Sequence, residues 1–533
     1  MNLRRSLILV PAALIGPVLL CAADEPAGRT EFNRDVAPLL VRRCLECHNE
    51  RQAAGGLVLT TSARALAGGD SGSVIAPGDP DASYLIERVA GGEMPPERQG
   101  RSQRLPDGEI ETLRRWIKAG AAWPEERTLD LYEATSDTRG GRDWWSLQPV
   151  RRPDVPRVEV PDRRKDNPAA ANPIDAFIFA RLHADGFDPA PPADRRVLLR
   201  RLSYDVVGLP PTFDEIEEFV ADTSETAWQR RVDRLLASPL FGERWARHWL
   251  DVVRFAETSG YERDQEKPFA WKYRDWVVQA FNSDKPYDRF IAEQLAGDEL
   301  PGRLEETVIA TGFLRLGTWN DEPNDPEDYQ YERLEDLVHA TSTAFLGLTV
   351  KCARCHDHKF DPIPQVDYYR IASAFWAGPI AARGRELLGG PTVEELGFAD
   401  VLGWTDVSAA PPPLHVLKYG DRHHPEQAVD PAPLSAVPAL FHPFDSPREA
   451  SGRSSTPSSG AERSPNAAVT ATAAGGRTGS PSYGDSTPRT TQRRLQLANW
   501  ITDPRNPLTP RVIVNRLWQQ HMGHGLVRSP DNF

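Results

Sequence analysis

The stretch Cys44-Leu45-Glu46-Cys47-His48 decides the fold of the N-terminal part of the chain, and its pattern returns at Cys352-Ala353-Arg354-Cys355-His356. Both stretches have the form C-x-x-C-H, the attachment signature of a covalently bound c-type haem. The two thiols add to the two vinyl groups of one porphyrin, and the adjacent histidine ligates the iron. Four of the five cysteines lie in these motifs. Cysteine usage therefore indicates a redox cofactor and argues against a disulfide scaffold.

Met94 is the predicted sixth ligand of the first haem. It is one of three methionines in the chain and lies in the loop Gly92-Glu93-Met94-Pro95-Pro96, downstream of the first motif. The two prolines stiffen the backbone where a loop must hold a thioether against iron. A methionine also fills gaps in cores, but the order of motif, loop and amphipathic helix favours ligation. Methionine ligation raises the haem potential and favours electron transfer.

Other interpretations of the first motif are a thioredoxin-like dithiol, a zinc half-site and a disulfide. The dithiol is typical of a βαβ context, which the surrounding sequence lacks. Zinc needs four ligands, and no nearby Cys or His completes a set around Cys44. The first motif is therefore predicted to hold one haem c through Cys44 and Cys47, with His48 and Met94 on the iron.

The second motif has no obvious sixth ligand, because no methionine follows it until Met522. A second haem with His356 and another histidine on the iron is one interpretation. The histidines that could complete it are His248, His339 and His358. A second interpretation is a cramped metal site formed by Cys352, Cys355, His356 and His358. A third is a disulfide or another structural role.

Two polar clusters outside the motifs are further candidates for function. The first, on one face of a predicted helix, consists of His248, Asp251 and Arg254. One interpretation of this cluster is an acid/base or metal-binding role. The other, which we favour, is a polar helix face with a local ion pair. The second, an acidic loop, consists of Glu322, Asp325 and Asp328. Such a loop can bind Ca²⁺, but a solvated loop is favoured.

The bulk composition bounds the class of protein. A chain of 533 residues can hold two to four domains, each with a core. The formal net charge of -13 argues against nucleic acid as a partner, because phosphate binding needs clustered Lys and Arg. A mildly acidic surface favours solubility and can also help docking to a basic redox partner, whose identity the sequence does not give.

Residues 1–23 are predicted to be a signal peptide. Arg4 and Arg5 form a basic region, a mostly apolar stretch follows, and small residues precede a cleavage point before Asp24. Cys21 would instead be lipidated in a lipoprotein signal, but Leu20 stands where a small residue is needed. The mature protein is therefore expected to be exported, to the periplasm or the cell surface, with no transmembrane helix.

The mature chain is predicted to be mainly α-helical. The expected parts are a small domain over 31–124, a linker over 125–170, a helical domain over 171–378 that contains the second motif, a Pro-rich and low-complexity linker over 379–492, and the start of another domain over 493–533. The linker is rich in Ser, Pro and Gly, and we expect disorder there because this composition cannot bury a core. The sequence stops soon after periodicity returns, which predicts a fragment.

Three helices are predicted with their boundaries. Apolar spacing indicates a helix over 109–119 with Asp107 as its N-cap. Thr212 and Glu215 form a capping box for the helix that follows the turn over Gly208–Thr212. Another helix, over 331–346, delivers the chain to the second motif.

The first domain resembles the planctomycete-type cytochrome c domain. The stretches that carry the resemblance are Cys44–His48, Gly55–Leu57, Pro77–Pro80, Met94–Pro96 and Leu113–Ala121. The resemblance implies a class I-like helical cytochrome c fold, with Cys44 and Cys47 holding the haem and His48 and Met94 as axial ligands.

The rest of the chain is similar to two successive planctomycete domains of unknown function. The first likeness runs from Asn172–Asp175 through Gly208–Thr212 and the second motif to Tyr369. The second begins near Arg494, includes Val514–Trp518, and covers only the opening of that domain, so it is expected to be truncated. Neither likeness implies a substrate.

Three functions follow as hypotheses. The first is an exported haem c-binding electron-transfer protein, with one haem and an open question of a second at Cys352–His356. The second is an extracellular or periplasmic oxidoreductase or carbohydrate-active enzyme that uses the cytochrome domain as electron acceptor. The third is a cell-surface binding protein in which the haem is incidental.

Overall fold

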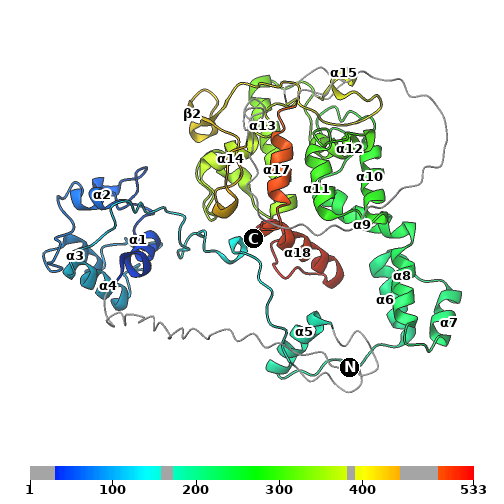
Figure 1. Cartoon of the computed structure of the whole chain (residues 1–533), viewed down its shortest axis with the longest axis horizontal. Coiled ribbons are helices and arrows are strands. Elements are labelled where there is room, and N and C mark those ends of the chain that lie inside the picture. The colour runs from blue at the N-terminus through cyan, green and yellow to red at the C-terminus, as the bar shows by residue number, and fades with distance from the viewer. Residues whose placement is uncertain (1–29, 158–171, 381–389, 445–489) are drawn as a thin grey trace, which may run out of the picture. The chain divides into compact units, whose positions relative to one another are not determined.

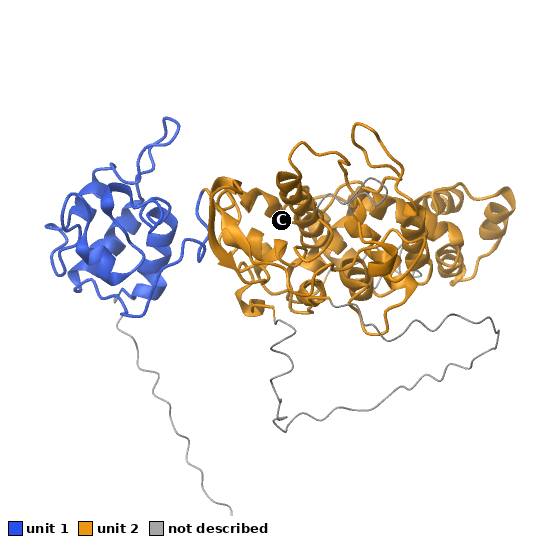
Figure 2. Ribbon diagram, turned by 90° about the horizontal axis from the view of Figure 1, so that it is seen from above, with its two compact units in different colours: residues 1–137 blue, residues 138–533 orange. Residues whose placement is uncertain are grey.

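The computed structural model describes residues 30–157, 172–380, 390–444 and 490–533 (Figure 1). The predicted signal peptide lies outside these residues, as do residues 381–389 and 445–489 of the predicted Pro-rich and low-complexity linker. The chain divides into two compact units, unit 1 over residues 1–137 and unit 2 over 138–533 (Figure 2). The described residues are mainly helical, with one two-stranded sheet, which confirms the predicted fold class. None of the described helices is long and apolar enough to cross a membrane.

Unit 1 is a cluster of short helices around one core. A π-helical turn over Phe32–Val36 leads into α1 (Ala37–Arg43), and α2 (Ser62–Ala67), α3 (Tyr84–Ala90) and α4 (Asp107–Lys118) follow. The predicted apolar face of α4 is buried, which confirms this helix. The predicted N-cap is wrong by one residue: Pro106 is the N-cap, and Asp107 lies in the first turn, where its charge still suits the helix dipole.

Residues after α4 extend this core. The Trp123 ring lies 4.3 Å from the Phe32 ring, measured between centroids, and its Nε1 donates to the carbonyl of Arg127 at 2.8 Å. Leu129 and Tyr132 are buried. The linker predicted over 125–170 therefore starts too early, because isolated apolar residues without a helical period still pack onto a neighbouring core.

Two glycine-rich loops of unit 1 pack backbone against backbone. Asp70 donates its N–H to the carbonyl of Gly55 at 2.8 Å, and Gly69 and Gly72 exchange two backbone hydrogen bonds. Gly68 has φ +80°, and a Cβ on it would lie 2.1 Å from the carbonyl oxygen of Gly72. Only glycine fits this position, because both the backbone conformation and the space exclude a side chain.

Unit 2 contains the remaining helices and the sheet. The helices are α5 (Pro173–Ala184), α6 (Arg195–Val206), α7 (Phe213–Ala221), α8 (Ala227–Leu236), α9 (Pro239–Val252), α10 (Ala270–Asn282), α11 (Tyr287–Ala296), α12 (Glu305–Ala310), α13 (Pro326–Thr341), α14 (Gln365–Ala372), α15 (Val393–Leu396), α17 (Arg493–Ile501) and α18 (Leu508–Met522). The antiparallel strands are β1 (Leu414–Leu417) and β2 (Pro425–Val429). The predicted capping box of α7 is present.

Local sequence explains how two of these helices are placed. A Cβ on Gly242 of α9 would lie 2.5 Å from the carbonyl oxygen of Val278, so glycine lets α9 approach α10 closely. Helix α13 begins five residues before the predicted start, because the Asp325 side chain accepts hydrogen bonds from the first-turn N–H groups of Glu327 and Asp328. The end of the helix predicted over 331–346 is a separate π-helical turn, Ser342–Leu346, which leads toward the second motif.

Residues 390–444 belong to the core of unit 2, and the prediction of a linker there is wrong. Trp404, Leu414 and Leu434 are fully buried in the main hydrophobic cluster. The Trp404 ring fills the space in front of Gly378, where a Cβ would lie 2.2 Å from the indole. This segment packs mostly as irregular and extended backbone, so its buried residues show no helical period and the Pro-rich sequence conceals them.

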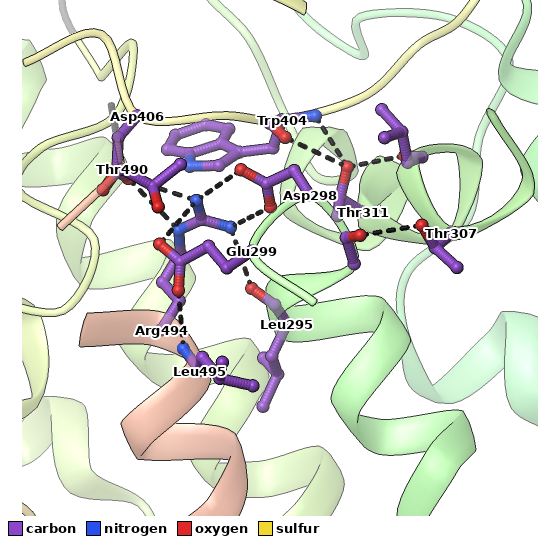
Figure 3. Close-up of polar contacts among 12 residues, drawn as sticks. Leu295, Asp298, Glu299, Thr307, Thr311, Trp404, Asp406, Thr490, Arg494 and Leu495 are labelled. Carbon is purple, nitrogen blue, oxygen red and sulfur yellow. Dashed lines mark hydrogen bonds and ion pairs between the residues drawn. The ribbon is translucent and has the colours of Figure 1, made fainter. Parts of the chain in front are cut away.

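Arg494, at the start of α17, is the centre of a fully buried ionic network (Figure 3). Its Nη1 and Nη2 donate to the two Asp298 oxygens at 2.6 and 2.7 Å, and Nη2 also donates to Asp406 at 3.2 Å. Glu299 accepts from the N–H of Leu495 at 2.7 Å. These contacts join α17 to segments about 90 and 200 residues earlier in the chain. Removing one member of such a buried pair typically costs about 3–5 kcal/mol.

Stability should depend on pH through Glu299. Burial raises the pKa of Glu299 from 4.5 to about 8, with Asp406 and Asp298 adding to the increase and Arg494 opposing it. Between these values the folded chain keeps a proton that the unfolded chain releases. The free energy of unfolding should therefore fall as pH rises from about 5 to 8, by up to ~1.4 kcal/mol per unit. In Glu299→Gln this contribution should vanish, as measured by urea unfolding at several pH values.

The control for that experiment is Glu225→Gln, which removes an exposed carboxylate and should leave the pH dependence of the wild type unchanged. If the free energy of unfolding changed with pH in the same way for wild type and Glu299→Gln, Glu299 would not be the group that keeps a proton in the folded chain.

The glycine loops of unit 1 give a second prediction. Gly68→Ala should lower the melting temperature of unit 1 clearly more than Gly72→Ala. Both positions have positive φ, but a Cβ on Gly72 meets nothing within 4 Å, whereas one on Gly68 meets backbone. The difference between the two variants isolates the steric clash, and calorimetry measures it. Equal shifts would show that the loop accommodates a side chain at Gly68.

Candidate functional site

The first C-x-x-C-H motif forms a tight turn directly after α1. Cys44 is the C-cap of α1 and donates its N–H to the carbonyl of Leu40, and the N–H of His48 donates to the carbonyl of Cys44 at 3.0 Å. Leu45 is fully buried between the two cysteines and anchors the turn in the core. Asn49 Nδ2 donates to the carbonyl of Leu45 at 2.8 Å and closes it.

Met94 is brought to the same place by the turn that follows α3. The N–H groups of Glu93 and Met94 both donate to the carbonyl of Arg88, at 3.0 and 3.2 Å. These bonds fold the chain back just before Met94. Cys44, Cys47, His48 and Met94 then line one cavity of about 290 Å³ in unit 1. The structure thus brings together the four residues that the sequence analysis proposed for the first haem.

The walls of this cavity are mostly apolar. The side chains that form them are Leu57, Leu59, Val74, Tyr84, Leu85, Val89, Pro95 and Pro96. Gly55 and Gly69, from the two glycine-rich loops, also line it, so the loop packing described above shapes the wall beside the motif. A cavity of this kind suits a large, flat, apolar group.

Charged side chains lie at the edge of the cavity. Arg98 Nη2 donates to Glu46 at 2.8 Å, and both side chains are 41 % exposed. This ion pair connects the motif with the segment just after Met94-Pro95-Pro96. Because it is exposed, it contributes at most about 1 kcal/mol to stability, so its main effect is to fix the loop. Arg43 and Arg88 also line the cavity, and both are paired with carboxylates, Arg43 with Glu109 and Arg88 with Glu93.

The donor set fits a covalently bound haem. His48 Nδ1 is buried and has no hydrogen-bond partner among the residues that the structure describes. Burial raises the pKa of the Cys44 thiol to about 12, and the neighbouring Cys47 adds to the increase. A wall that disfavours a thiolate suits the uncharged sulfur of a thioether better than a zinc ligand or a reactive dithiol, both of which need the thiolate.

The second motif lies at the surface of unit 2. A 3₁₀ turn over Val350–Arg354 holds its first cysteine, and Cys352, Cys355 and His356 are all exposed. Both cysteines are free. Within the described part of the chain, no three His, Cys, Asp or Glu side chains are placed to hold a metal, which speaks against the cramped metal site.

His358 is not a ligand, because protein groups occupy both of its ring nitrogens. Nδ1 accepts from the N–H of Asp361 at 2.8 Å, and Nε2 lies 3.1 Å from Thr349 Oγ1. Burial lowers the pKa of His358, which keeps the ring neutral in this role. In contrast, His356 Nδ1 lies 2.6 Å from the carbonyl of Asp357 and donates to it, which leaves Nε2 free.

The remaining sequence candidates are placed elsewhere in unit 2. His248, Asp251, Arg254 and His339 line one cavity, which does not include Cys352 or Cys355. We predicted a local ion pair within the α9 face. Arg254 instead pairs with Asp336 of α13, at 3.3 Å. No sequence pattern places His339 or Asp336 beside Arg254, since both lie over 80 residues from it.

The acidic loop is neither a Ca²⁺ site nor simply solvated. Arg422, near the β-hairpin turn, binds Asp325, Glu327 and Asp328 at 2.7, 2.7 and 2.6 Å. Glu322 pairs with Arg263. The carboxylates therefore neutralise arginines from distant parts of the chain.

Comparisons with known proteins agree with this division of the chain. Residues 44–98 match the family described as planctomycete cytochrome C, residues 173–378 match the protein family of unknown function DUF1549, and residues 493–533 match the family of unknown function DUF1553. No curated protein and no solved structure matches the chain. The chain therefore carries, in this order, a match to planctomycete cytochrome C and matches to two families of unknown function, as the sequence resemblance predicted.

Proposed function

We propose that the chain is an exported electron-transfer protein that carries haem c in unit 1. The observation that supports this most strongly is that two thiols, one imidazole and one thioether, from residues 44 to 94, line a single apolar cavity. The cytochrome family match covers the same residues. Haem c is attached outside the bacterial cytoplasm, so the proposal includes removal of residues 1–23 and a location in the periplasm or at the cell surface.

Each residue of the site has a distinct role in this proposal. Cys44 and Cys47 anchor the group through thioethers, while His48 and Met94 bind the two faces of the iron. The bound haem would supply one-electron redox chemistry. The apolar walls exclude water and so favour the reduced, less charged iron, which raises the potential. The redox partner would approach the exposed edge of this cavity.

The second motif is proposed as a second attachment site. The observation in its favour is His356, whose Nδ1 hydrogen bond to the carbonyl of Asp357 leaves Nε2 free to bind iron. This is the tautomer that axial and metal-bound histidines commonly adopt. Both thiols are free and exposed, as attachment requires.

The axial role of Met94 is tested with Met94→Leu in the haem-loaded protein. Leucine keeps the apolar volume but removes the sulfur. The methionine–iron charge-transfer band should disappear and the midpoint potential should fall, because methionine ligation raises it. Optical spectroscopy and a redox titration measure the two effects.

Met522→Leu is the matched control, since Met522 is 59 % exposed at the end of α18, and it should leave both readouts unchanged. A charge-transfer band that survives in Met94→Leu would contradict the ligand assignment.

The second site is tested by replacing Cys352 and Cys355 with serine. The pyridine haemochrome absorbance per protein should fall by half if both motifs carry haem. An unchanged value would show that only the first motif does.

A further inference from the structure

A second cavity, of about 580 Å³, lies within unit 2. Its walls come from α9, from α13 and the turn that follows it, and from α18 together with Pro530 and Asp531. The volume is typical of sites for small molecules. Helices α9 and α13 fall within the match to the first family of unknown function, and α18 falls within the match to the second. The cavity is therefore complete only when both parts are present.

Several residues that line this cavity carry buried hydrogen-bond donors without acceptors. The atoms are Nε and Nη1 of Arg254, Nε of Arg516 and Nε1 of Trp245, for which the described parts of the chain offer no partner. Arginine and tryptophan side chains can only donate. A buried polar group without a partner loses its hydrogen bonds to water and destabilises the fold. A ligand that brings acceptor oxygens would remove this destabilisation.

Arg254 is held in an unfavourable backbone conformation. It follows the C-cap of α9 with φ +59°, in the left-handed region where helices usually place glycine. A residue with a side chain is strained in this conformation, because its Cβ lies too close to the carbonyl oxygen that follows. Strain of this kind clusters at functional sites, where it holds a group in position. The guanidinium is further oriented by Asp336, at 3.3 Å.

The charged side chains named around the cavity carry one net negative charge. Arg516 pairs with Asp531 at 2.8 Å, Arg254 pairs with Asp336, and Asp251 adds an exposed carboxylate. An anionic ligand would therefore be held by the unpartnered N–H donors against a weak repulsion, which is smaller for a singly charged group than for a doubly charged phosphate.

The two histidines of the cavity do not change its net charge at neutral pH. Burial lowers the pKa of His248, and the nearby positive charges of Arg244 and Arg247 lower it further. Burial also lowers the pKa of His339, and the positive charges of Lys351 and Arg254 lower it further. Both rings are therefore uncharged at pH 7 and can donate or accept one hydrogen bond each.

The apolar part of the lining favours a ring-shaped ligand body. Trp245, Trp249 and Phe281 contribute aromatic surface, and Leu517 contributes aliphatic surface. Aromatic side chains pack well against flat rings and against the apolar faces of sugars.

We propose that this cavity binds a small organic carboxylate with a ring-shaped body, and that Arg254 and Arg516 donate to its carboxylate. The site would be independent of the haem in unit 1, so the proposal stands or falls separately from the electron-transfer function. It gives the two families of unknown function a shared role in building one binding site.

The test is isothermal titration of the full chain with benzoate and glucuronate, each compared with its neutral counterpart, benzyl alcohol and glucose. At least one acid should bind saturably, and at least tenfold more tightly than its neutral counterpart. If neither acid exceeds its counterpart, the proposal is overturned.

Arg254→Gly then identifies the site. Glycine relieves the positive φ, so the variant should fold, but it should lose at least tenfold in affinity for the acid. Asp284→Gly is the matched control, because Asp284 also has positive φ (+51°) but does not line the cavity, and it should bind as the wild type does. Arg516→Gln provides the same readout if Arg254→Gly does not fold. Unchanged affinity in a folded Arg254→Gly or Arg516→Gln variant would also overturn the proposal.

Discussion

Unit 1 folds its short helices so that Cys44, Cys47, His48 and Met94 line one mostly apolar cavity of about 290 Å³. Covering the apolar walls of such a cavity removes apolar surface from water, which is favourable by roughly 25 cal/mol per Å². The entire stability of a small domain is about 5–15 kcal/mol. A covalently held group in this position would therefore be a structural element of unit 1 as well as its redox centre, and the same residues serve both purposes.

Unit 2 is stabilised by a buried ionic network and a large hydrophobic core, both of which connect distant segments of the chain. Arg494 fastens α17 to Asp298 and Asp406, and this contact fixes the start of the segment that continues into α18. Helix α18 in turn supplies one wall of the cavity that contains Arg254. The buried network thus positions a wall of the proposed carboxylate site without touching it.

Local features of the sequence predicted local structure well. The spacing of Ile110, Leu113 and Trp116 gave α4, because a helix face has a period that a short window contains. The capping box at Thr212 was found for the same reason. Trp404 and Leu434 were missed, because residues buried by irregular backbone carry no period.

Contacts between distant residues that no motif connects could not be predicted. Nothing near Arg494 in the sequence points to Asp298, and nothing near Arg254 points to Asp336. For the candidate sites, a motif of five residues indicated the haem chemistry, and the rarity of methionine drew attention to Met94. The cavity of unit 2 has no motif, because its lining residues come from segments far apart in the chain.

The most direct test of the central claim is mass spectrometry of peptides from the mature protein, purified from a host that attaches haem c. The account predicts that the peptide containing Cys44 and Cys47 carries the mass of one haem, bound through both sulfurs. The same peptide recovered with two free thiols, from a folded and exported protein, would contradict it.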